Sequence, residues 1–187
     1  MTARRSKLAV TMIHARYNWT ARILHWSMAV LVILQLVLGV AADKASKPLA
    51  GQLLNQHVRI GLLILALIIL RTLWRATHAP PPLPASVPPW QTLAASGAHR
   101  LIYLLLFVLP ISGYVLWGWI GRLLDWFGLF DIPILFEGGD DETWRSIAGY
   151  SHVYAAYLLV ALLVTHIAAA LWHEFVSRDH LISKRML

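Results

Sequence analysis

Four histidines stand inside or at the end of long apolar stretches of this 187-residue chain: His25, His57, His152 and His166. Imidazole binds metals and carries protons, and it is costly to place in hydrocarbon, so each is a candidate for function. His152 and His166 lie fourteen residues apart in one stretch. Fourteen residues make nearly four helical turns, so both rings would leave the same helix face, about 21 Å apart along the axis. This spacing predicts two stacked cofactor sites.

The composition indicates that these stretches lie in a membrane. The chain is 58% hydrophobic and 13% charged, with a mean hydropathy of +0.62, whereas soluble domains are about 25% charged. Four stretches are long enough to span, at about residues 23–42, 53–74, 97–120 and 150–172. We therefore predict an all-α fold, an integral membrane four-helix bundle forming one domain over residues 1–187.

The segments between the spans differ in character. Residues 43–56 form a short polar link, residues 79–89 are proline-rich and predict an extended connector, and residues 121–147 form the longest loop. Pro110 predicts a kink in the third span. The chain has no cysteine, which excludes disulfides, zinc–thiolate sites and iron–sulfur clusters.

The net charge of +7 is explained by membrane topology, so it does not imply nucleic-acid binding. Four spans place both termini on one side, together with the link over residues 75–98. That side carries most of the Lys and Arg residues, whereas the other side has a slight acidic excess. The positive-inside rule therefore predicts cytoplasmic N- and C-termini in a multi-pass protein of a cell membrane.

This topology sorts the four histidines into two pairs, each at one level and each drawn from two helices. His25 and His166 lie near the cytoplasmic ends of their spans, and His57 and His152 lie near the outer ends. Six-coordinate haem needs one imidazole on each face of its iron. A lone membrane histidine is often merely a packed or interfacial residue, but two level-matched pairs predict an inner and an outer haem with these axial ligands.

The fourteen-residue step recurs on the other spans. Gly39 lies fourteen residues after His25, Arg71 after His57, and Gly113 after His99. A glycine at the level of the other haem would let a porphyrin approach the backbone, and an arginine there could pair a propionate. The alternatives are helix-packing glycines and a positive-inside anchor.

Two further histidines belong to the inner level. His99 begins the third span and could replace an inner ligand, but we expect it to donate a proton or hydrogen bond to a quinone. His173 shares that level and is a second candidate for the quinone site, or else an interfacial residue.

Several motifs together resemble the bacterial cytochrome b561 family over essentially the whole chain. They are Arg22-Ile23-Leu24-His25-Trp26, Leu101-Ile102-Tyr103-Leu104-Leu105 with Pro110, and the ending from His166 through His173-Glu174-Phe175 to Arg178-Asp179 and Lys184-Arg185-Met186-Leu187. The resemblance implies a bacterial inner-membrane bundle with two haems b, held by His25 and His166 and by His57 and His152. It also implies electron transfer between the periplasm and ubiquinone, with superoxide oxidases among the members.

Bis-histidine iron has no open position, which favours electron transfer over oxygen binding. We expect a superoxide:ubiquinone oxidoreductase with an outer donor and an inner quinone, embedded in membrane lipid. Arg59, beside His57, would steer superoxide. One alternative is a cytochrome subunit relaying electrons between a periplasmic partner dehydrogenase and quinone, docked on the apolar stretch over residues 127–136. A second is a haem-free proton or metal carrier, for which the chain lacks histidines clustered at short spacing.

Overall fold

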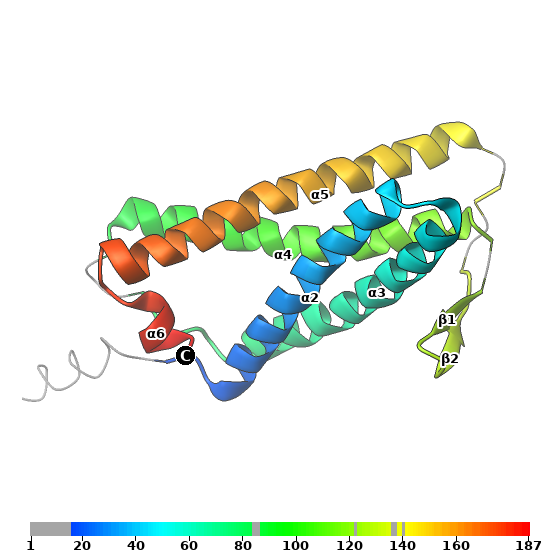
Figure 1. The fold of residues 1–187 in the computed structure, drawn as a ribbon. Coiled ribbons are helices and arrows are strands. Elements are labelled where there is room, and N and C mark those ends of the chain that lie inside the picture. The colour runs from blue at the N-terminus through cyan, green and yellow to red at the C-terminus, as the bar shows by residue number, and fades with distance from the viewer. Residues whose placement is uncertain (1–15, 84–86, 122, 136–137, 140) are drawn as a thin grey trace, which may run out of the picture.

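The structure is a computed structural model that describes residues 16–83, 87–121, 123–135, 138–139 and 141–187. In this part of the chain, four helices are each long and apolar enough to cross a membrane. They are α2 (Trp19–Lys44), α3 (Lys47–Thr77), α4 (Pro89–Gly118) and α5 (Glu142–Leu171), shown in Figure 1. The predicted all-α membrane bundle with four long apolar helices is confirmed.

The helices begin earlier than the apolar stretches because their first turns are polar or proline-containing. The Asn18 side chain accepts a hydrogen bond from the Ala21 N–H at 2.9 Å, which caps α2. Asp141 caps α5 by accepting from the N–H groups of Thr143 and Trp144. Pro89 is the first residue of α4, where a missing N–H costs nothing. The loop expected over residues 121–147 is therefore shorter than predicted, because its last residues belong to α5. Helix α4 continues through Pro110.

The core forms where apolar faces of all four helices meet. Its buried residues are Met28, Val32, Ile64, Ile68, Ile102, Leu105, Leu106 and Leu159. Among the described residues, α2 packs on α3, α3 on α4 and α4 on α5. The backbone of α5 makes little or no close contact with α2 and α3. Side chains, such as Leu159 of α5, bridge the distance between α5 and these two helices.

We call the end of the bundle where α2 starts and α5 finishes the inner end, and the opposite end the outer end. At the inner end, the π-helix η1 (Trp172–Val176) and the short helix α6 (Leu181–Arg185) fold back toward the start of α2 (Figure 1). The described N-terminal residues and the C-terminus therefore lie at the same end. The expectation that this end faces the cytoplasm remains a prediction, and the basic residues within 1–15 that contribute to it lie outside the described residues.

At the outer end, a small antiparallel hairpin interrupts the expected loop. Strand β1 (Leu124–Trp126) pairs with β2 (Phe130–Ile132), so that Leu124 faces Ile132 and Trp126 faces Phe130. Figure 1 shows the hairpin projecting sideways from the bundle next to α3. These two strands were not predicted from the sequence.

Candidate functional site

The outer histidines face each other across the space between α3 and α5. The ring centroids of His57 and His152 lie 6.2 Å apart, with their planes at 70°. His57 Nδ1 lies 3.1 Å from the backbone carbonyl oxygen of Gln35, which can only accept. Nδ1 must therefore carry the proton, which leaves the Nε2 lone pair of His57 free to bind a metal.

His152 is oriented in the same way by a hydroxyl group. The Ser112 Oγ lies 3.0 Å from the Leu109 carbonyl oxygen, to which it donates, and 2.9 Å from His152 Nδ1. Because its one proton is used, the hydroxyl accepts from the Nδ1–H of His152. Both outer rings thus present an unprotonated Nε2, the form in which histidine coordinates metals.

Two glycines make room for the outer rings. A Cβ atom at Gly39 would lie 3.2 Å from Cε1 of His57, and one at Gly113 would lie 3.2 Å from Cε1 of His152. Contacts this short force a neighbour to move, so larger side chains would displace the rings. The fourteen-residue spacing predicts both glycines at the outer level, and in the structure both lie beside the outer pair. Their contact with a haem remains a prediction.

The inner histidines form a larger cluster. His25 on α2 and His166 on α5 have ring centroids 6.3 Å apart, with their planes at 81°. His99 on α4 packs edge-on against His166 at 5.2 Å. The structure therefore brings together three of the four histidines that the sequence placed at the inner level.

Two arginines on α3 make the inner cluster cationic. Arg71 donates from Nε to the Tyr103 hydroxyl at 2.8 Å and from Nη1 to the Ala21 carbonyl at 3.4 Å. Its charge acts on the neighbouring His25 and His166. The guanidinium groups of Arg71 and Arg75 both lie over the Tyr103 ring, at 5.9 and 5.7 Å. Such a cluster can hold a carboxylate or another anion.

The folded C-terminal segment closes this end of the bundle. His173 pairs with Asp179 at 2.7 Å. Glu174 accepts from the Ser183 Oγ at 2.7 Å and from the backbone of residues 182 and 183. The Met186 carbonyl accepts from the Trp26 Nε1 at 3.0 Å. His173, the second quinone candidate, is thus held by its own segment.

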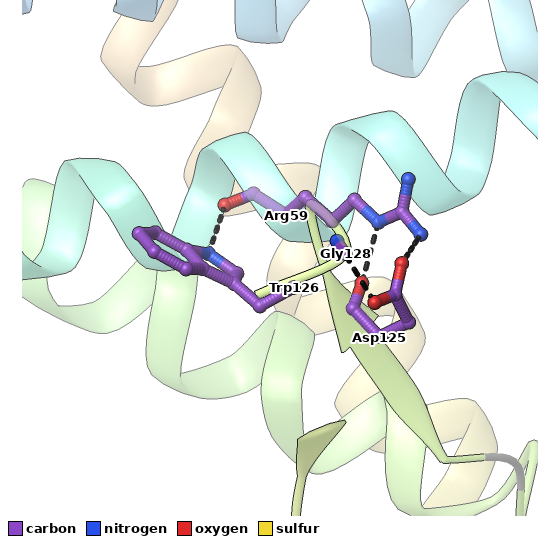
Figure 2. Close-up of polar contacts among 4 residues, drawn as sticks. All are labelled: Arg59, Asp125, Trp126 and Gly128. Atoms are coloured by element: carbon purple, nitrogen blue, oxygen red, sulfur yellow. Dashed lines mark hydrogen bonds and ion pairs between the residues drawn. The ribbon is translucent and has the colours of Figure 1, made fainter. Parts of the chain in front are cut away.

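Arg59 forms hydrogen bonds and an ion pair with the hairpin, as Figure 2 shows. Its Nη2 donates to the Asp125 carboxylate at 2.5 Å and its Nε donates to the Asp125 carbonyl at 2.6 Å. Asp125 therefore compensates the charge that was expected to attract superoxide.

Comparison with known proteins identifies the family of this chain. A family model described as prokaryotic cytochrome b561 matches residues 16–187. Cytochrome b561 homolog 2 of Escherichia coli (strain K12) is 35% identical over 175 residues, covering 92% of this chain and 91% of that protein. This chain belongs to the prokaryotic cytochrome b561 family.

Two other relatives cover similar lengths. Cytochrome b562 of Cereibacter sphaeroides is 28% identical over 87% of this chain and 90% of its own length. The probable superoxide oxidase CybB of Yersinia pestis is 27% identical over 93% and 97%. The protein is thus similar throughout to membrane b-type cytochromes, and family membership implies haem b and electron transport.

The residues present fit a haem of this family. Two imidazoles that bind one metal from opposite sides have ring centroids about 6.2 Å apart, because each metal–nitrogen bond is about 2.0 Å and the nitrogen lies about 1.1 Å from the centroid. The two cross-helix pairs, at 6.2 and 6.3 Å, match this value. The 5.2 Å between His99 and His166 is too short, which favours a neighbouring role for His99. Among the described residues, no group of three or more His, Cys, Asp or Glu side chains is arranged to hold a metal ion.

The groups that orient the outer histidines were not predicted from the sequence. The backbone carbonyl of Gln35 holds His57, and the hydroxyl of Ser112 holds His152, each from another helix. For Ser112, a polar side chain inside an apolar span was an available signal, because such groups need a hydrogen-bond partner in the membrane. The same signal exists for the Gln35 side chain, which donates from Nε2 to the His57 carbonyl at 2.8 Å.

Proposed function

We propose that this protein is a di-haem cytochrome that oxidises superoxide at its outer end and reduces ubiquinone at its inner end. His57 and His152 would hold the outer haem, and His25 and His166 would hold the inner one. The name of the Yersinia pestis relative suggests the superoxide activity.

One observation carries the proposal: both histidine pairs have the separation of two axial ligands, and they lie at opposite ends of one membrane bundle. When bound, haem b with two histidine ligands supplies reversible one-electron transfer without an open position for oxygen. The chain contributes the ligand orientation, through the hydrogen bonds of Gln35 and Ser112, and an apolar core that separates the donor from the acceptor.

The inner cluster supplies groups suited to a quinone. Reduction of a quinone takes two electrons and two protons. His99 would not bind a haem iron in this proposal, so its imidazole is free to carry protons. Arg71 and Tyr103 offer hydrogen bonds beside it. Overall, two superoxide anions lose one electron each and become oxygen, while one ubiquinone gains two electrons and two protons and becomes ubiquinol.

The test is to supply superoxide enzymatically to the purified haem-loaded protein with a ubiquinone analogue, and to follow superoxide loss and quinol formation together. We expect two superoxide consumed per quinol formed. His99→Gln should lower quinol formation at least tenfold while superoxide still reduces the haem. Arg100→Gln, an exposed change next to His99, is the control.

If dithionite reduces the haem but superoxide does not, the superoxide part of the proposal is wrong and a different donor must be sought. If superoxide reduces the haem and His99→Gln forms quinol at the wild-type rate, His99 has no part in the quinone site.

A further inference from the structure

Helix α3 has one face toward the bundle and one toward the lipid. Residues separated by 7, 11 or 14 positions share a helix face. His57, Ile64 and Ile68 form the inward face, since Ile64 is 3% and Ile68 0% exposed. Arg59 falls instead on the face of Leu70 and Leu73, which are 50% and 62% exposed. Arg59 therefore marks the outer end of a lipid-facing stripe.

The hairpin is fastened to this stripe, and its polar groups are satisfied where it attaches. The two bonds from Arg59 hold Asp125 (Figure 2), whose second carboxylate oxygen accepts from the Gly128 N–H at 2.9 Å. Trp126 donates from Nε1 to the Arg59 carbonyl at 3.2 Å. Leu124 is 2% exposed and packs with Val58. Among the described residues of this junction, the Arg59 charge and the Trp126 indole N–H both have partners, as a low-dielectric setting requires.

The hairpin is amphipathic. Directly paired strand residues project to the same face, so Trp126 and Phe130 share a face with Leu124 and Ile132, while Asp125 and Asp131 share the other. The inner part of the apolar face packs on the bundle, but Phe130 at its outer part is 57% exposed.

The turn exposes further apolar side chains where polar ones are usual. Leu129 is 71% and Phe127 43% exposed. Phe127 has a φ of 55°, in the left-handed region that a bulky residue adopts at a cost and that Asn or Gly fill more readily. The turn would form more easily with a polar residue, so its geometry does not account for the apolar tip.

We propose that the hairpin over residues 124–132 rests in the outer membrane–water interface, with Leu129 and Phe130 in contact with phospholipid. The hairpin continues the lipid-facing stripe of α3 beyond the span, and aromatic residues concentrate at this level of membrane proteins. The hairpin contains no basic residue, so its contact with the membrane would be apolar. Binding would therefore not require anionic lipid, and a zwitterionic phospholipid would be sufficient. The proposal is independent of the haem and of the electron donor.

The absence of cysteine allows a direct test with single-cysteine variants. Leu129→Cys, carrying a nitroxide label, is placed in phosphatidylcholine vesicles as the haem-loaded protein. Its relaxation is measured with oxygen, which partitions into lipid, and with a water-soluble nickel chelate. Leu70→Cys gives the lipid reference, and Thr143→Cys gives the water reference. Asp131→Cys, on the opposite face of the same hairpin, is the matched control.

We expect the Leu129 label to show the oxygen-to-nickel ratio of the Leu70 label, severalfold above that of the Thr143 label, and the Asp131 label to resemble Thr143. If the Leu129 label were as accessible to the nickel chelate as the Thr143 label, the tip would lie in water and the proposal would be overturned. A Leu129 label shielded from both reagents would overturn it as well, since a protein surface would then cover the tip.

Discussion

The two ends of the bundle hold their histidines in opposite electrostatic settings. The outer rings contact neutral groups, a backbone carbonyl and a hydroxyl, and they are backed by glycine. The inner rings lie next to Arg71 and Arg75 and beside a third histidine. One end therefore fixes ligand orientation, and the other adds positive charge and a proton carrier.

This difference predicts a direction for electron transfer through the bundle. Nearby positive charge favours the reduced form of an iron site over the oxidised form, because reduction lowers the positive charge of the site. The inner site should therefore have the higher potential, and electrons entering at the outer end should move inward.

The largest expected effect comes from filling the space beside an outer ring. Gly113→Leu places a branched side chain where even a Cβ would lie 3.2 Å from His152, so we expect loss of the outer haem with the inner haem retained. Haem quantification should show half the wild-type content. Gly97→Leu is the matched control on α4, because no atom lies within 4 Å of a Cβ built there. Full haem content in Gly113→Leu would contradict the assigned site.

Removing the inner charge should change a potential without removing a haem. We expect Arg71→Gln to lower the inner midpoint potential by about 60 mV, a tenfold change in a one-electron equilibrium, with the outer potential unchanged. Redox titration followed by absorbance measures both. Arg100→Gln, exposed at the same end, should leave both potentials in place. Equal shifts at the two sites would remove the electrostatic distinction between the ends.

At the outer end, Asp125→Asn should free the charge of Arg59. One unit charge acting at about 10 Å through water is worth about 0.4 kcal/mol, so superoxide-dependent haem reduction should become about twofold faster at low ionic strength. The difference should vanish in high salt. Arg59→Glu should slow the same rate. The control is Glu142→Gln, which breaks the exposed pair with Arg145. A rate that is independent of salt in all three variants would exclude steering by Arg59.

The smallest effect is expected where the C-terminal segment is attached. Glu174→Ala removes the acceptor for Ser183 and for the backbone of residue 182, so the segment should detach more often. We expect severalfold faster tryptic cleavage after Arg178, with both haems retained. Glu142→Ala, at an exposed carboxylate, is the control. An unchanged cleavage rate would mean that other contacts, such as those of the buried Arg185 with the carbonyls of Pro81 and Pro82, hold the segment.

The parts of the molecule that follow from helical geometry could be predicted from the sequence. Apolar length located the four spans, and the fourteen-residue step placed Gly39 at the level of His57 and Arg71 at the level of His25. Such relations depend on the rise and turn along each helix and on the alternating direction of successive spans. They needed no knowledge of how the helices pack.

The parts that depend on contacts between distant segments could not be predicted. The hairpin has strands of three residues, too short for a pattern, and Phe127 stands where a turn signal would be expected. The fold of the C-terminal segment rests on Glu174, whose partners lie eight and nine residues further along. The charge of Arg59 was evident, but its compensation by Asp125 was not.

The most direct test of the account is haem quantification with reduced-minus-oxidised spectra for the wild type, His57→Ala and His166→Ala. We predict two haems b in the wild type and one in each variant, with different spectra for the haem that remains in each. His99→Ala should keep both haems. A single haem in the wild type, loss of both haems in either variant, or loss of a haem in His99→Ala would contradict the two cross-helix pairs.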